Sequence, residues 1–375
     1  MRYFGVKLSQ KNTCRRSSVW WCFVTSTQIL SSRFSRIPIS TSETFKGSYH
    51  SLQYSRFPNG VRLRKVQSAF KMSLPETYDS PVSLAIIGGT GISRLDGFKS
   101  VASLKITTPW GSPSSPVIIL ETPSGAPVAF ISRHGLHHEY TPSEVPSRAN
   151  IAALRSIGVR TIIAFSAVGS LREEILPRDF VIPTQIIDRT KGIRPATFFD
   201  GGVVAHVGFS DPFDERVGRI IKASEGALEG GAKIHEGKTL VCMEGPQFST
   251  RAESKLYRSW GGDIINMSVL PESKLAREAE IHYAMICMAT DYDCFRDDAP
   301  PVNVPEVLAH MAANAVNAQH LIAALLIELV KEEHEDLLSG QGLKESSKWA
   351  ICTKPEGISK EAKERLGFLF PEWDL

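Results

Sequence analysis

Two carboxylates, Asp291 and Asp293, stand two residues apart in the segment TDYDC, directly after an apolar run. In extended backbone, side chains at i and i+2 point to the same side, so the two carboxylates would share one patch. Such a pair binds a cation, hydrogen-bonds a ligand rich in donors, or divides into a proton donor and a proton acceptor. Taken alone, the segment is also compatible with a solvated loop.

An arginine and a histidine, Arg133 and His134, follow another apolar run. A guanidinium can donate two parallel N–H groups to phosphate, and a neighbouring imidazole can add another donor. The Arg-His-Gly sequence is also the signature of histidine phosphatases, although there it follows the first strand of the domain. His137 and His138 could suggest a metal, but no further acidic or histidine cluster completes a ligand set, so the sequence predicts no metal site.

A glycine-rich segment, Gly-Gly-Thr-Gly at 88–91, follows the first apolar run. Glycines let backbone N–H groups approach an anion closely, and the Thr90 hydroxyl adds a donor. A dinucleotide-binding fingerprint would need Gly or Ala where Arg94 stands. The segment therefore favours a phosphate or small-anion loop over a NAD site, with a plain strand-to-helix turn as the alternative.

Three further apolar runs end in small, hydroxyl-bearing or aromatic residues. Ser166 closes one run, and Phe248 follows another just before a helical pattern. Phe248 could stack on a flat ring, although a lone Phe is more often part of a core. Met267 and Ser268 close the third run and place a thioether beside a hydroxyl.

These segments are positioned by short β-branched runs that alternate with helical patterns. The alternation predicts one α/β domain over 82–333, with helices covering both faces of a sheet. Ligands of open α/β sheets bind beyond the carboxyl ends of the strands, which is where the segments above fall. Expected strands are 84–87, 117–121, 128–132, 161–166, 180–187, 239–244, 264–269 and 283–290. Expected helices are 143–157, 212–229, 251–260 and 304–333.

The charge is divided unevenly along the chain, whose formal net charge is +3. Positions 1–71 hold 13 of the 43 Lys and Arg residues and a single acid, while the remainder has 30 basic and 39 acidic residues. The basic average therefore predicts no nucleic-acid binding by the folded part. Segment 1–71 is expected to be unstructured, as either a mitochondrial transit peptide or an artefact of an upstream start codon, with Met72 as the true start.

The other end of the chain and the cysteines are less informative. Segment 334–375 is predicted as a polar tail whose apolar patch at 366–370 could dock back onto the domain. No stretch reaches the roughly 18 uninterrupted apolar residues of a membrane span, so no membrane association is expected. The six cysteines form no CxxC pair, which favours reduced thiols over disulfides or a zinc site.

The segments IIGGTG, RHGxxH, AVGSLREE, EGPQFSTRAES, NMS and TDYDC, in this order, resemble the purine nucleoside phosphorylase family, in its branch that acts on 5′-methylthioadenosine. The resemblance covers about 84–333. It implies the single-domain nucleoside phosphorylase fold, a twisted mixed β-sheet flanked by helices, and a homotrimer. It also implies no metal or organic cofactor, with inorganic phosphate as co-substrate. The location implied is cytoplasmic, with the nucleus open as well and mitochondria only if 1–71 is real.

The resemblance also assigns roles to residues. Phosphate would be held by Thr90, Arg133, His134, Ser166, the backbone at Ala167, and Ser268. The nucleoside would contact Met267 at the ribose, Phe248 at the purine, Asp291 and Asp293 at N7 and the 6-amino group, with Tyr292 between them, and His206 from the neighbouring subunit. Ser249 and Val304 would tune substrate choice. Ser166 and Ser268 stand where the animal enzymes have Thr, but the hydroxyl donor is kept.

The reaction implied is phosphorolysis of 5′-methylthioadenosine to adenine and 5-methylthioribose 1-phosphate, as part of purine and methionine salvage. Asp291 is expected to protonate N7 of the leaving adenine, which requires a pKa raised above about 3.9 by burial or by Asp293. Asp293 is expected to accept from the amino group. Val304 and Leu308, one helical turn apart, are candidates for the methylthio pocket, although such a pair is more often simply core. A phosphorylase of 6-oxopurine nucleosides and a non-catalytic homologue are the alternatives.

Overall fold

The computed structural model describes residues 74–298 and 302–374, so the interpretations of segment 1–71 lie outside the described residues. A nine-stranded sheet runs through this part in the order β2-β3-β4-β1-β5-β8-β7-β6-β9. Because β9 also pairs with β5, the strands β5, β8, β7, β6 and β9 form a closed ring from which the other four extend. The strands are β1 (Leu84–Gly88), β2 (Lys99–Leu104), β3 (Val117–Glu121), β4 (Pro127–Ser132), β5 (Thr161–Ser170), β6 (Phe180–Asp188), β7 (Ile234–Cys242), β8 (Ile264–Asn266) and β9 (His282–Tyr292).

The strands that carry the chemistry run side by side in one direction. β1 pairs in parallel with β4 and β5, and β5 pairs in parallel with β9. Parallel neighbours end at the same edge of the sheet, so the residues after β1, β4, β5 and β9 converge there. These strands are apolar and buried along most of their length, as expected for strands covered by helices on both faces.

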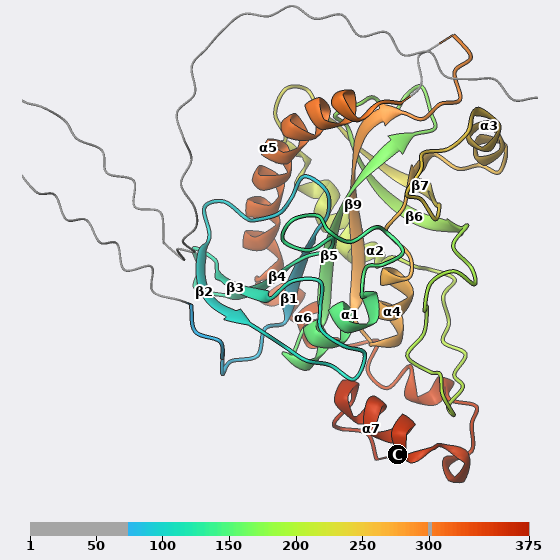
Figure 1. The fold of residues 1–375 in the computed structure, drawn as a ribbon. Helices are drawn as coiled ribbons and strands as arrows, with labels where there is room; N and C mark the ends of the chain where they lie inside the picture. The colour runs from blue at the N-terminus through green and yellow to red at the C-terminus, as the bar shows by residue number, and fades with distance from the viewer. Residues whose placement is uncertain (1–73, 299–301, 375) are drawn as a thin grey trace, which may run out of the picture. The chain divides into compact units, whose positions relative to one another are not determined.

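Helices cover the sheet on both sides (Figure 1). One core cluster joins the sheet to α1, α4 and α7, and a second joins it to α2, α5 and α6. The sequence determines several helix ends locally: Thr250 and Glu253 form a capping box before α3, and Asn303 caps α5. The helices are α1 (Ser147–Ser156), α2 (Glu215–Ala223), α3 (Arg251–Ser259), α4 (Glu272–Glu278), α5 (Val304–Leu329), α6 (Glu335–Ser339) and α7 (Lys360–Leu369).

All eight expected strands are present, and the α/β class is confirmed. The sequence reading missed β2, whose sequence KSVASL carries little apolar signal because it mixes a lysine and two serines with only three apolar residues, and it missed α4, α6 and α7. It extended strand 264–269 too far, because β8 ends at Asn266. It also began the first helix too early: α1 starts at Ser147, directly after Pro146, because the residue before a proline disfavours helical backbone.

The C-terminal patch docks back onto the domain, as expected. Leu366 and Phe370 are buried in the first core cluster, and the Phe370 ring stacks on Trp373 with centroids 3.7 Å apart. The Arg155 guanidinium from α1 lies over the Phe370 ring, 5.2 Å from its centroid, and pairs with Glu372. Residues 334–374 therefore belong to the same compact unit as the sheet.

One helix, α5, is long and apolar enough to cross a membrane by length and composition alone. Its buried side, which includes Ala318, Leu321, Ile322 and Leu325, belongs to the second core cluster with residues of the sheet. A core helix of a soluble protein passes the same test, so the helix is weak evidence for a membrane span.

Candidate active site

A cavity of about 410 Å³ lies at the sheet edge where β1, β4, β5 and β9 end. Eleven of the fourteen residues to which the resemblance assigns roles line it. At one end these are Thr90, Arg133, His134, Ser166, Ala167 and Ser268. At the other end they are Phe248, Ser249, Met267, Asp291 and Asp293. Residues as far apart in the chain as Thr90 and Asp293 thus form one site.

The cation at the first end is buried and held firmly. Arg133 is 1% exposed, and its Nε and Nη2 each donate to a Glu272 carboxylate oxygen at 2.8 Å. Nη1 donates to the Phe165 carbonyl at 2.7 Å. Burial lowers the pKa of Arg133, but the Glu272 carboxylate outweighs the effect of burial, so the pKa of Arg133 is raised above its ordinary value. The guanidinium thus stays charged beside the cavity.

Glycine is required where Arg133 passes the first loop. A Cβ built on Gly89 would collide with the Phe165 carbonyl oxygen and lie 2.6 Å from Arg133 Nη1. The absence of a side chain at Gly89 therefore leaves room for the Arg133 guanidinium, in addition to exposing the backbone N–H groups of the Gly-Gly-Thr-Gly segment.

Two hydroxyls complete the first end. Ser166 Oγ and Ser268 Oγ are 3.1 Å apart, and Asn266 Nδ2 donates to Ser166 Oγ at 3.1 Å. Because a hydroxyl can rotate to donate or accept, this pair can turn toward an anion without moving backbone. Both serines thus supply hydroxyl groups to this end of the cavity.

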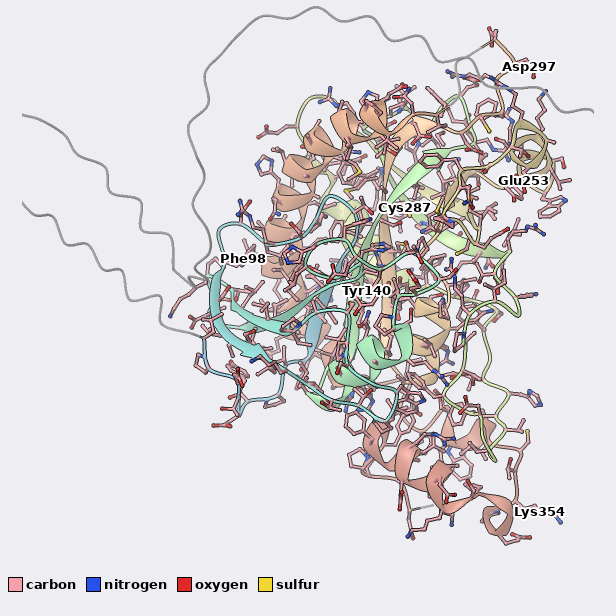
Figure 2. The ribbon with its side chains drawn as sticks, viewed as in Figure 1. Phe98, Tyr140, Glu253, Cys287, Asp297 and Lys354 are labelled. Atoms are coloured by element: carbon pink, nitrogen blue, oxygen red, sulfur yellow. The ribbon has the colours of Figure 1, made fainter. Side chains whose placement is uncertain are left out.

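His134 differs from the expectation of a simple donor. Its Nδ1 is 3.0 Å from the carbonyl oxygen of Tyr140, labelled in Figure 2, and since a carbonyl only accepts, Nδ1 carries the proton. Burial, followed by the neighbouring Arg133 charge, lowers the pKa of His134 to about 4. The ring is neutral at pH 7, and its Nε2 is an acceptor that suits a protonated phosphate oxygen.

The second end holds the two carboxylates. Burial raises the pKa of Asp291 to about 6, with the Asp293 charge adding to the effect and a 2.7 Å hydrogen bond from the Thr290 hydroxyl opposing it. Burial also raises the pKa of Asp293, whose Oδ2 has no hydrogen-bond partner among the described residues. Asp291 is therefore a carboxylic acid that can hold a proton close to neutral pH, as the general-acid role requires.

A second glycine makes room for these carboxylates. Gly169 pairs with Asp291 across β5 and β9, and a Cβ there would lie 3.2 Å from Asp291 Oδ1 and 3.1 Å from Ile265 Cγ2. The missing side chain leaves the cavity open beside Asp291. Phe248 faces this end and is 47% exposed, so its ring is available to a flat ligand.

Three predicted residues do not line the cavity. Tyr292 points away because it alternates with Asp291 and Asp293, and its hydroxyl donates to the Glu173 carbonyl. His206 lies elsewhere, with its backbone N–H bonded to the Ala350 carbonyl at 2.9 Å, so its role toward a neighbouring subunit stays a prediction.

The third is Val304, which lies on another face of α5, so its role in substrate choice stays a prediction. Val304 and Leu308 are 56% and 54% exposed, whereas Val307 and Met311, also one turn apart on α5, line the cavity. Apolar residues occur on several faces of α5, so spacing alone could not choose the pair.

Sequence reasoning also missed a buried arginine that ties two site segments together. Arg194 donates from Nη1 to the Met267 carbonyl at 2.7 Å and from Nη2 to the Glu244 carbonyl at 2.7 Å. It thereby holds the segment before Phe248 against the one that bears Met267. No spacing in the sequence points to it, because most of its partners are backbone carbonyls and its side-chain partner Ser143 lies 51 residues away in the chain.

Replacing Arg194 with lysine is expected to raise the KM for the nucleoside about tenfold and to cost on the order of 2 kcal/mol of stability. A single ammonium cannot span both carbonyls, so at least one is left buried and unsatisfied. Steady-state kinetics and chemical denaturation measure the two effects. Arg189→Lys, at an exposed arginine of the same segment, is the control expected to change neither. Unchanged kinetics in Arg194→Lys would contradict the role of Arg194 in holding the two site segments together.

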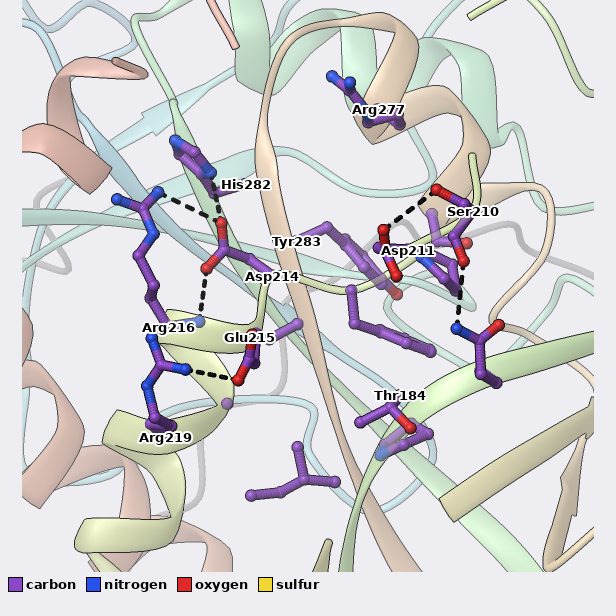
Figure 3. Close-up of a pocket in the computed structure, with 18 of the residues that line it drawn as sticks. Thr184, Ser210, Asp211, Asp214, Glu215, Arg216, Arg219, Arg277, His282 and Tyr283 are labelled. Atoms are coloured by element: carbon purple, nitrogen blue, oxygen red, sulfur yellow. Dashed lines mark hydrogen bonds and ion pairs between the residues drawn. The ribbon is translucent and has the colours of Figure 1, made fainter. Parts of the chain in front are cut away.

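A larger cavity of about 740 Å³ lies between α2, β6 and the start of β9 (Figure 3). Its charged side chains largely pair with one another: His282 Nδ1 lies 2.7 Å from Asp214, and Arg219 lies 2.6 Å from Glu215. Arg216 and Arg219 are thus already ion-paired, and we place the chemistry in the smaller cavity, where the residues predicted from the sequence converge.

Potential metal ligands gather away from that smaller cavity. Within residues 74–298 and 302–374, one grouping has the required spacing, Glu328, Glu333 and His334, and none of these lines the site. The expectation of a metal-free site stays a prediction.

The family model described as the phosphorylase superfamily matches residues 83–327. This range includes both the glycine-rich and the Arg133 segments on which a NAD site or a histidine phosphatase could have rested. S-methyl-5′-thioadenosine phosphorylase of Tuber melanosporum is 61% identical over 305 residues, which cover 80% of this chain and 99% of that protein. The Emericella nidulans protein of the same name is 62% identical over 302 residues, covering 80% of this chain and 85% of that one.

The chain belongs to the S-methyl-5′-thioadenosine phosphorylase family. Solved structures of this family agree. The methylthioadenosine phosphorylase from an antarctic soil metagenomic library has a TM-score of 0.71 and 42% identity, covering 78% of this chain and 99% of that one. The Schistosoma mansoni methylthioadenosine phosphorylase in complex with adenine has a TM-score of 0.66 and 32% identity, covering 71% and 98%. Family membership confirms the resemblance and the nucleoside phosphorylase fold.

Proposed function

We propose that the chain catalyses phosphorolysis of S-methyl-5′-thioadenosine to adenine and 5-methylthioribose 1-phosphate. The observation that carries this is the polarity of the cavity: a buried arginine with two hydroxyls at one end, and a carboxylic acid with a pKa of about 6 at the other. One end suits phosphate and the other a purine that leaves as it gains a proton.

At the anion end, Arg133, Ser166 and Ser268 would hold phosphate beside the anomeric carbon of the ribose. The glycosidic bond breaks through a state in which the sugar carries positive charge, and an adjacent phosphate dianion stabilises that charge. Fixing the nucleophile next to the reacting carbon also removes the entropy cost of a bimolecular encounter.

At the base end, Asp291 would donate its proton to N7 as the C–N bond breaks, and the electron pair of that bond would go to the adenine ring. Asp293 would accept from the 6-amino group, which would satisfy its unpartnered buried oxygen. The Phe248 ring and the Met267 thioether would pack on the flat and ribose faces, and Val307 and Met311 would surround the methylthio group.

The direct test is phosphate-dependent release of adenine from methylthioadenosine, with adenosine and inosine as comparators. Adenine release that requires phosphate supports the proposal, and its absence with active, folded protein contradicts it. A 6-oxo group offers no amino donor to Asp293, so inosine is expected to react at least 100-fold more slowly. Equal rates on inosine would instead support the 6-oxopurine alternative.

We infer that the enzyme works without a metal or organic cofactor. Exhaustive dialysis against EDTA is therefore expected to leave kcat and both KM values unchanged, as measured with saturating phosphate and methylthioadenosine. Loss of activity that returns on adding a divalent cation would contradict this inference. In the proposed mechanism Arg133 supplies the positive charge that binds phosphate and Asp291 supplies the proton for N7, so no metal ion is needed.

We also propose that the enzyme is a homotrimer that serves purine and methionine salvage. We propose a cytoplasmic location, with the nucleus as a second location and mitochondria as a location only if segment 1–71 is translated. Two exposed apolar side chains lie near His206: Val204, which is 51% exposed and two residues before it, and Trp349, which is 80% exposed and precedes the Ala350 whose carbonyl accepts from His206. Assembly would cover both side chains. Analytical ultracentrifugation tests the trimer, and a fully active monomer would contradict it.

A further inference from the structure

Arg133 is one member of a buried group of three side chains. Its carboxylate partner, Glu272, also accepts a hydrogen bond from the Tyr283 hydroxyl, with Tyr283 Oη 2.7 Å from Glu272 Oε1. The same Oε1 accepts from Arg133 Nη2 at 2.8 Å. Glu272 is 1% exposed and Tyr283 3%, so water does not compete for these bonds.

The three residues come from separate elements, so their meeting is a property of the fold. Arg133 follows β4, Glu272 is the first residue of α4, and Tyr283 is the second residue of β9. The Tyr283 ring is held in turn by a stacked contact with Phe213, with centroids 6.1 Å apart. Tyr283 lines the larger cavity (Figure 3), whereas neither Tyr283 nor Glu272 lines the substrate cavity.

The hydrogen bonds of Arg133 leave part of its guanidinium for a ligand. A guanidinium has five N–H groups. Three are used within residues 74–298 and 302–374, two by Glu272 and one by Phe165, which leaves one on each terminal nitrogen. The plane of the guanidinium, set by the carboxylate, decides where these two remaining groups point.

Tyr283 contributes a hydrogen bond and no charge. Burial, and after it the Glu272 carboxylate, raises the pKa of Tyr283 well above its ordinary value, so the hydroxyl keeps its proton and donates. A role that only neutralised the arginine would therefore need Glu272 and not Tyr283, whereas a role in orientation needs both.

We propose that Glu272 and Tyr283 are positioning residues for the phosphate substrate: Tyr283 fixes the Glu272 carboxylate, which orients the Arg133 guanidinium so that its two remaining N–H groups meet the anion. The proposal rests on the proposed function and adds two residues that do not line the substrate cavity. It assigns their effect to phosphate rather than to the nucleoside.

The test is Tyr283→Phe in the full chain, with KM measured separately for inorganic phosphate and for methylthioadenosine. The KM for phosphate is expected to rise about tenfold, with the KM for the nucleoside within about twofold and kcat at saturating phosphate largely kept. Tyr257→Phe is the matched control: Tyr257 is equally buried, on α3, and its hydroxyl pairs with Arg189. It is expected to leave the phosphate KM unchanged.

Glu272→Gln provides a second variant should Tyr283→Phe fold poorly. It is expected to raise the phosphate KM about 30-fold or more. For each variant, calorimetric titration with inorganic phosphate should show a loss in affinity that matches its rise in KM. An unchanged or lower phosphate KM in folded Tyr283→Phe or Glu272→Gln overturns the proposal, as does an equal change for both substrates. Failure of the wild-type chain to release adenine would instead remove the proposed function itself.

Discussion

Replacing Asp291 with asparagine is expected to lower kcat for methylthioadenosine phosphorolysis by about 100- to 1,000-fold. Asparagine has the same shape and still accepts the Thr290 hydrogen bond, but it cannot give a proton to the departing adenine. The wild-type rate should carry the signature of the same group: because burial raises the pKa of Asp291 to about 6, kcat/KM is expected to fall as pH rises above about 6. Steady-state kinetics from pH 5 to 9 measures both.

The same variant is expected to be more stable than the wild type at neutral pH. A carboxyl whose folded pKa lies above its unfolded value contributes stability that is present at pH values below about 4 and is lost as pH rises through about 6. At pH 7.5 the buried Asp291 is charged and destabilises the fold, so Asp291→Asn should gain on the order of 2 kcal/mol there and little at pH 4.

The exposed Asp297→Asn is the control for both measurements, because its carboxylate pairs with Lys255 at the surface. It is expected to change neither kcat nor stability. A normal kcat in Asp291→Asn would contradict its role as the acid, and a loss of stability at pH 7.5 would contradict the account of its burial.

Replacing Arg133 with methionine is the second large effect. The KM for phosphate is expected to rise at least 100-fold, because the only cationic side chain at that end that is charged at pH 7 and predicted to contact phosphate is removed. The variant is also expected to lose about 3 to 5 kcal/mol of stability, since Glu272 is left buried and unpaired. Phosphate titration and urea denaturation measure the two effects.

A double variant, Arg133→Met with Glu272→Met, separates them. Removing both charges eliminates the unpaired carboxylate, so most of the lost stability is expected to return while phosphate binding does not. Phosphate affinity close to that of the wild type in either variant would show that the anion is held elsewhere.

Much of the site could be read from local pattern. Asp291 lies in β9 and Asp293 directly follows its end, and the two face the same side because alternate residues of extended backbone do so. By the same rule Tyr292 had to face the other side. The resemblance grouped Tyr292 with its neighbours as a substrate contact, and in the structure it lies outside the cavity. Strand alternation was the better guide there.

Long-range partners could not be read in this way. The carboxylate that binds Arg133 lies 139 residues away in the chain, and Arg194 is anchored to backbone carbonyls that no residue type announces. On α5, Val304 and Leu308 have the same spacing as Val307 and Met311, and only packing against the sheet decides which pair faces the cavity.

Residue type and strand periodicity were thus sufficient for the class of fold and for the ends of the strands that carry polar groups, because these depend on contacts within a few residues. The family came from the resemblance of the motifs, taken in their order along the chain. Tertiary structure decided which donors of Arg133 remain free, that His134 is neutral and that Asp291 holds its proton up to a pH of about 6. Each of these depends on burial and on charges brought in from distant segments, and the sequence does not display either before the chain has folded.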